Sequence, residues 1–162
     1  NNSIPEWVRT GEVDFGFVNM SVFSGKATFL KEGEYRAVLP QAHPLAAQDA
    51  VTLEQLASEP FLVIEEGSLS RPLEAFREDG LAPHVRLRVH DDYSILSMVE
   101  HGLGVSILPE LVLRKTNYQI AIRPLQPVVT RKLGFIAKSK NELPLASKYF
   151  VNFMVEHIGE LP

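Results

Sequence analysis

Apolar positions along the chain follow two spacings, one typical of strands and one typical of helices. Residues 61–64 are all apolar, which indicates a strand buried on both faces. Val85, Leu87 and Val89 alternate with polar residues, which predicts a strand with one buried face. Residues 105–108 predict a third strand, and the two intervening segments have helical spacing. This order predicts a parallel, three-stranded α/β lobe with right-handed crossovers.

The boundaries of the two helices in this lobe are marked by individual residues. Ser70 begins the first helix and Gly80 ends it. Asp91 or Asp92 caps the second helix, which Gly102 ends.

The segment before residue 60 has the same alternation. A capping box at residues 3–6 begins a helix that Gly11 ends, and residues 13–18 predict a covered parallel strand. Another strand is expected at residues 35–39, and a second capping box, at residues 52–55, begins a short helix. A helix cap that leads directly into a buried strand is typical of the middle of a domain, so we expect further elements upstream.

The last part of the chain predicts two strands and a helix. The strands lie at residues 119–125 and 131–137. Pro144 begins the helix, and its spacing predicts that Leu145, Tyr149 and Phe153 face the core. We expect residues 1–60 to be the remainder of a first lobe with a crossover segment, residues 61–125 to be a second lobe, and residues 126–162 to be a return strand and C-terminal helix packing back towards the first lobe.

Composition narrows the possible functions. The 162 residues, 45% of them hydrophobic, suffice for a folded core, and no apolar run is long enough to span a bilayer. Sixteen Lys and Arg against twenty Asp and Glu give a net charge of −4, which disfavours direct DNA binding. The absence of cysteine excludes disulfides, iron–sulfur clusters and thiolate zinc sites.

Catalytic motifs are weak. The five histidines have no metal-binding spacing, and Gly104–Val–Ser106 begins a nucleophile-elbow pattern that lacks its second glycine. Asp91 and Asp92 could form an acid/base pair or a cation site, but a helix cap is the favoured interpretation. We therefore expect neither an enzyme nor a bound metal or cofactor.

The segment Gly67–Ser–Leu–Ser70 joins the carboxyl end of a predicted buried strand to a helix amino end, which is where open α/β sheets bind ligands. The hydroxyls of Ser68 and Ser70 and the side chain of Arg71 could contact a ligand. The alternative is a plain helix cap in which Ser70 satisfies its own helix. Neither a Walker lysine nor GxGxxG follows, so nucleotide binding is not supported.

Several segments together resemble the effector-binding domain of LysR-type transcriptional regulators. The matching segments, which span nearly the whole chain, are residues 7–18, 39–46, 52–57, 60–64 and, above all, 98–110 (MVEHGLGVSILPE). The resemblance implies an α/β, two-lobe fold like that of type 2 periplasmic binding proteins, with the first lobe incomplete because its first strand and helix, and the strand after them, are missing.

The resemblance also implies a function. A small-molecule effector, such as a small carboxylate or an aromatic acid, would bind between the lobes of a cytoplasmic homodimer or tetramer. DNA would be contacted only by an absent N-terminal winged helix-turn-helix.

Carried over by position, the resemblance implies two sets of residues. The effector contacts fall on Glu66, Gly67, Ser68, Leu69, Ser70, Gly104, Ser106 and Ile107, with Phe17 and Val18 from the first lobe. The subunit interface falls on Leu96, Glu100 and His101.

Two alternatives remain open at this point. A solute-binding protein of a transporter would share the fold. An enzyme on the same scaffold would need a base or nucleophile in the cleft, for which Glu66 or Asp92 would be the candidates.

Overall fold

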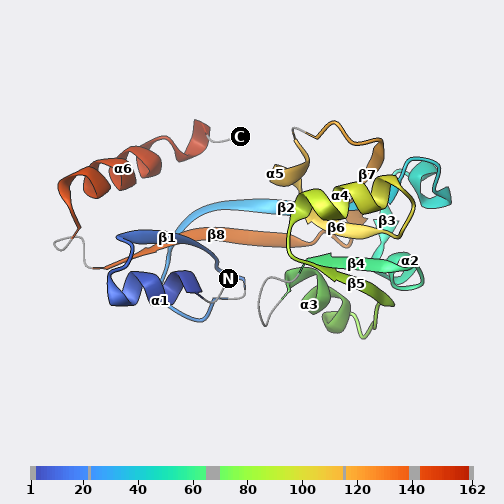
Figure 1. The fold of residues 1–162 in the computed structure, drawn as a ribbon, viewed down its shortest axis with the longest axis horizontal. Coiled ribbons are helices and arrows are strands. Elements are labelled where there is room, and N and C mark those ends of the chain that lie inside the picture. The colour runs from blue at the N-terminus through green and yellow to red at the C-terminus, as the bar shows by residue number, and fades with distance from the viewer. Residues whose placement is uncertain (1–2, 22, 65–69, 115, 139–142, 161–162) are drawn as a thin grey trace. The chain divides into compact units, whose positions relative to one another are not determined.

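The computed structural model describes residues 3–21, 23–64, 70–114, 116–138 and 143–160. The chain forms two compact units (Figure 1). Unit 1 comprises Asn1–Glu32 and Arg131–Pro162, and unit 2 comprises Gly33–Thr130. The predicted boundary at residue 60 therefore differs from the observed one, because residues such as Tyr35, Leu39 and Leu56 pack into the core of unit 2.

Unit 1 places its two main helices on opposite faces of one sheet (Figure 1). Its elements are α1 (Ser3–Thr10), β1 (Phe15–Asn19), the start of β2 (Thr28–Pro40), β8 (Thr130–Ala137), α6 (Leu145–Glu156) and the 3-10 turn η2 (Ile158–Glu160). On one face Gly16 lies so close to Ile4 that a Cβ at this position would be 2.2 Å from Ile4 Cγ2. On the other face Phe15 stacks on Phe150 of α6, with ring centroids 5.3 Å apart.

The expectation of a parallel strand near residues 13–18 is wrong. β1 pairs antiparallel with β8, with Phe15 opposite Ala137 and Asn19 opposite Leu133. The apolar residues on both faces are explained by the two helices, which cover an antiparallel strand as they would a parallel one.

The predicted inner face of the final helix is also wrong. Leu145 and Tyr149 are each 69% exposed and Phe153 is 59% exposed, whereas Val151 and Met154 face the core. The helix carries apolar residues around most of its circumference, so its spacing does not select one face.

Unit 2 contains the remaining strands. They are most of β2, β3 (Val51–Thr52), β4 (Phe61–Ile64), β5 (Val85–Val89), β6 (Ser106–Pro109) and β7 (Ile120–Gln126). β2 pairs antiparallel with β6 and β7, and β3 pairs parallel with β7.

The predicted parallel lobe is correct for its first two strands. β4 and β5 are parallel, and Val105 bridges to Phe61 in the same direction. Leu62 N donates to Val105 O and Val105 N donates to Pro60 O, and both donor–acceptor distances are 2.8 Å. Beyond that bridge the third strand, β6, pairs with β2 and not with β4 along its length, because β2 supplies a long antiparallel partner that segment 61–108 does not contain.

The helices of unit 2 are η1 (Pro44–Ala47), α2 (Leu53–Ala57), α3 (Arg71–Glu78), α4 (Asp92–Glu100) and α5 (Glu110–Leu113). Of these, α2, α3 and α4 begin and end close to the expected residues, whereas η1 and α5 were not predicted. The second capping box is confirmed, since Gln55 N donates to Thr52 Oγ1 and Thr52 N donates to Gln55 Oε1. Gly80 and Gly102 follow α3 and α4 with φ of 70° and 73°, as terminating glycines do.

α3 and α4 cover opposite faces of the β4–β5 pair (Figure 1). Phe61 and Val63 pack with Phe76 of α3, whereas Leu62 packs with Ile95 of α4. The single buried face predicted for β5 is wrong, because the register shifts after Phe61 and leaves Leu87 partly exposed.

Candidate functional site

The carboxyl ends of β4 and β5 form the edge at which the sequence predicts a ligand. Because the two strands are parallel, they end at the same edge of their sheet, and the next helices along the chain are α3 and α4. Of the predicted residues here, Glu66, Gly67, Ser68 and Leu69 lie outside the described residues. Ser70 is described.

Ser70 occupies the position before α3, but its hydroxyl makes no capping hydrogen bond to the helix. Only its backbone carbonyl is used there, accepting from Glu74 N at 2.9 Å. The alternative of a Ser70 that satisfies its own helix through its side chain is therefore wrong. Arg71 has a partner within the chain, since its Nη1 lies 3.0 Å from Glu78 Oε1.

Asp91 caps α4, which confirms the favoured interpretation. Ser94 Oγ donates to Asp91 Oδ2 at 2.7 Å and Ser94 N donates to Asp91 Oδ1 at 2.8 Å. These hydrogen bonds hold the pKa of Asp91 below its ordinary value because they favour the ionised carboxylate, and the bond from the Ser94 side chain has the largest effect. Both oxygens are thus engaged by the helix.

Replacing Asp91 by Ala is expected to destabilise the chain at neutral pH and to have progressively less effect in acid. A carboxyl group whose pKa is lower in the folded state contributes stability above its unfolded pKa, and this contribution is lost as the pH falls through the folded value. The pH range in which the contribution of Asp91 to stability is lost therefore lies below about pH 4. Urea unfolding of wild type and variant at pH 7 and at lower pH values measures the difference. A difference that does not shrink in acid would contradict the capping role.

Gly104, Ser106 and Ile107 lie beside β4, and Gly104 is at the amino end of that strand, next to Pro60. A Cβ at residue 104 would lie 2.3 Å from Pro60 O, so only glycine fits without a shift. Ser106 is the one buried polar residue among those described, and its Oγ donates to Leu62 O at 2.8 Å. Ile107 is buried in the core. This segment therefore has a packing role, and a hydroxyl held in this way is a poor nucleophile.

Phe17 and Val18, the predicted contacts from the first lobe, belong to unit 1. Phe17 is half-exposed and meets Phe15 edge to face, with ring centroids 6.1 Å apart. The Val18 side chain is buried with Val8 and Ile136, and its backbone lies opposite Gly134 in the β1–β8 pairing.

The predicted interface residues have different environments. Leu96 is 1% exposed and packs in the core of unit 2, so its side chain does not lie on the surface of α4 where an interface would need it. Glu100 accepts a 2.6 Å hydrogen bond from Gln119 N. His101 is exposed, and its Nδ1 lies 2.8 Å from Ser97 O.

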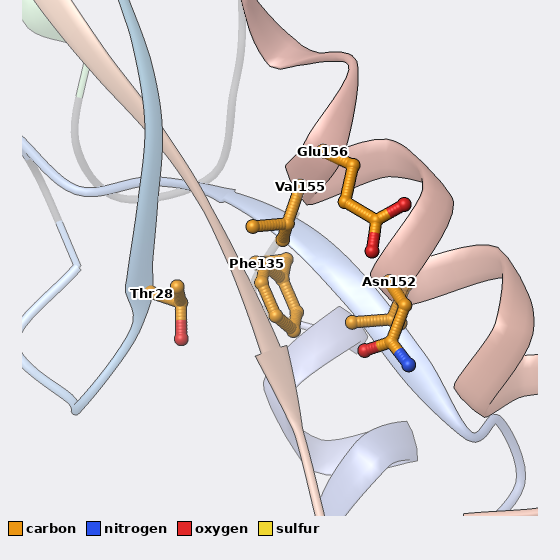
Figure 2. Close-up of a pocket in the computed structure, with 6 residues that line it drawn as sticks. Thr28, Phe135, Asn152, Val155 and Glu156 are labelled. Carbon is orange, nitrogen blue, oxygen red and sulfur yellow. The ribbon is translucent and has the colours of Figure 1, made fainter.

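A pocket that the sequence did not predict lies in unit 1, between the start of β2, β8 and α6 (Figure 2). It has a volume of about 180 Å³. We call it the α6 pocket, and its lining residues are Thr28, Phe135, Val151, Asn152, Val155 and Glu156. The sequence feature that could have indicated this pocket is the pair Asn152 and Glu156, two polar residues one turn apart in a mostly apolar helix.

Within the described ranges, no three His, Cys, Asp or Glu side chains are grouped so that they could hold a metal ion. No helix among those residues has the length and apolar character needed to cross a membrane.

A family model and curated relatives both place this chain among transcriptional regulators of one family. The family model described as "LysR substrate binding domain" matches residues 1–159. The regulator YvbU of Bacillus subtilis is 31% identical over 160 residues, which cover 98% of this chain and 55% of YvbU. The dual regulator GltC of the same species is 29% identical over 165 residues, covering 96% of this chain and 54% of GltC. The chain thus spans about half the length of the curated relatives it matches.

Solved structures share the fold. The effector-binding domain of QuiR in complex with shikimate superposes with a TM-score of 0.83 at 22% identity, covering 99% of this chain and 78% of that one. The regulatory domain of CcmR from Synechocystis, in complex with 2-PG, gives 0.81 at 19% identity, with 99% and 80% covered.

Proposed function

Because the chain belongs to the family of LysR substrate-binding domains, we propose that it is the effector-sensing module of a transcriptional regulator and performs no chemistry of its own. The observation that carries this proposal is the family match along residues 1–159. The predicted fold is confirmed: it is the mixed α/β fold of LysR effector-binding domains, which is of the type 2 periplasmic-binding-protein kind.

The proposed effector is a small carboxylate or an aromatic acid. Shikimate, which is bound by the QuiR domain of the same fold, is an acid of this kind. In this chain the amino end of α3 supports an anion, since the helix dipole places partial positive charge there. The Ser70 hydroxyl, which does not cap its own helix, is available to donate as well.

The proposed effector contacts are those carried over from the family, adjusted for their environments. Residues 66–70 are proposed to supply polar contacts, and the segment Gly104–Ile107 packs on β4. Phe17 contributes its exposed ring, and Val18 is its neighbour in β1. Glu100 and His101 stay in the proposed subunit interface, whereas Leu96 does not, because its side chain is buried.

Regulation then follows from binding. The full-length protein acts in the cytoplasm as a homodimer or tetramer, and its N-terminal helix-turn-helix contacts DNA. An effector changes the DNA contacts only if it binds one arrangement of the subunits more tightly than another. A transporter's solute-binding protein is not favoured, because the curated relatives YvbU and GltC are transcriptional regulators.

The test uses the full-length protein purified from its host. Native mass spectrometry is expected to detect a retained small acid, and adding that acid to the protein freed of ligand should change its affinity for its operator DNA. Chemical conversion of the acid by the protein, or binding without any change in DNA affinity, would contradict the proposal.

Ser70→Ala is expected to weaken binding of that effector by about 1 kcal/mol, or roughly fivefold, because one hydrogen bond is lost. Ser68→Ala should have a similar effect. The stability of the Ser70 variant should hardly change, since the hydroxyl makes no capping bond. Calorimetry measures the affinity, with Ser58→Ala as control, because the Ser58 hydroxyl bonds only to Glu54 O on the exposed side of α2. If wild type and both site variants bind the effector with equal affinity, Ser68 and Ser70 do not contact it.

A further inference from the structure

The α6 pocket combines an apolar floor with a polar rim. Phe135 lies at its base with Val155 beside it (Figure 2), and the lining residues Phe135 and Val151 are both buried. Its volume of about 180 Å³ can be compared with the roughly 150 Å³ apolar cavity that takes up benzene. The pocket therefore has room for a ligand built around one small ring.

The rim of the pocket carries negative charge. Glu156 is the last residue of α6, where the helix dipole places partial negative charge beside the carboxylate. In the part of the chain that the structure describes, Glu156 makes no ion pair. Thr28 and Asn152 add oxygen acceptors on the other sides of the opening (Figure 2).

We propose that the α6 pocket is a binding site for a small organic amine. The ammonium group lies at the rim against Glu156, and the apolar part of the ligand packs on Phe135 and Val155. Both the carboxylate and the helix end attract a cation, and a charge-assisted hydrogen bond to a carboxylate is about twice as strong as a neutral one. An acid would be repelled here, so this site and the proposed effector site at the β4–β5 edge take ligands of opposite charge.

The experiment is an NMR titration of the isotope-labelled chain with benzylamine, benzyl alcohol and benzoate. These probes have nearly the same shape but differ in charge. Benzylamine is positive, benzyl alcohol is neutral and benzoate is negative. Benzylamine is expected to shift the methyl resonances of Val151 and Val155 and the side-chain amide of Asn152 saturably, with a dissociation constant of about 1 mM. Benzyl alcohol should bind about tenfold more weakly, and benzoate should leave these resonances unshifted.

Three variants separate a charge effect from a structural one. Glu156→Gln should weaken benzylamine binding about tenfold and leave benzyl alcohol binding unchanged. Glu160→Gln removes the same charge from η2, outside the pocket, and should change neither. Val155→Trp should fill the pocket and abolish binding of both. The spectra without ligand report whether each variant is folded.

The proposal is overturned if benzoate shifts the pocket resonances as benzylamine does, or if Glu160→Gln weakens benzylamine as much as Glu156→Gln. Saturable shifts confined to residues outside the pocket would overturn it equally. Because the probes and readouts concern only unit 1, these outcomes are independent of whether an acid binds at the β4–β5 edge.

Discussion

Phe76→Ala is expected to lower the free energy of unfolding by about 4 kcal/mol, which is typical of truncating a fully buried phenylalanine. The Phe76 side chain is 0% exposed, and its ring meets that of Phe61 edge to face at 5.1 Å. Removing the ring leaves a cavity between α3 and β4 and ends an aromatic contact that stabilises beyond its buried area. Unfolding in urea, followed by far-ultraviolet circular dichroism, measures the loss.

Phe153→Ala is the matched control, because it deletes the same ring from α6. Phe153 is 59% exposed and stacks only on His157 among the rings, at 4.1 Å, so the expected cost is below about 1 kcal/mol. The single tryptophan, Trp7, lies in unit 1, and its fluorescence shows whether either variant unfolds that unit separately. Equal costs for the two variants would mean that the face assigned to α6 is incorrect.

Gly104→Ala is expected to destabilise the chain by about 3 kcal/mol, a large cost for adding one methyl group. The new Cβ would meet Pro60 O at 2.3 Å, and this carbonyl already accepts the hydrogen bond from Val105 N that joins the two segments. Because the obstacle is backbone, a side-chain rotation cannot relieve it, and the Val105–Phe61 bridge must shift.

Gly33→Ala provides the comparison for this variant. No atom lies within 4 Å of a Cβ at residue 33, and its φ is not in the left-handed region. Its substitution should change stability by less than about 1 kcal/mol, and in the stabilising direction if the unfolded chain loses freedom. Urea unfolding of both variants is the measurement, and a Gly104 variant as stable as wild type would show that the close packing of residue 104 is not required.

Features fixed by neighbouring residues could be predicted from the sequence. The capping box at Thr52 and Gln55, the cap at Asp91 and the terminating glycines Gly80 and Gly102 each depend on a few successive residues, and each is confirmed. The parallel pairing of β4 with β5 also followed from a local rule, since a helical crossover between two strands makes them parallel.

Features fixed by distant partners could not be predicted in this way. The direction of β1 depends on β8, and the partner of β6 is β2. The orientation of α6 depends on which apolar side chains of the sheet it meets, and spacing alone cannot supply this when most of the helix is apolar.

The candidate site divides along the same line. Its location at the strand ends and the capping role of Asp91 followed from strand order and residue type. The burial of Leu96 and the anchoring of Ser106 on Leu62 depend on how β6 and α4 pack against β4, and no short motif encodes that packing. The α6 pocket depends on segments more than a hundred residues apart.

The division of the chain into units has a consequence for its biosynthesis. Unit 2 is one continuous stretch, Gly33–Thr130, so a ribosome releases all of its residues before β8 emerges. β1 emerges early, yet its partner comes about 120 residues later, as the pairing of Phe15 with Ala137 shows. Residues 33–130 can therefore fold before β1 meets β8, and until then the apolar residues of β1 lack their partner strand.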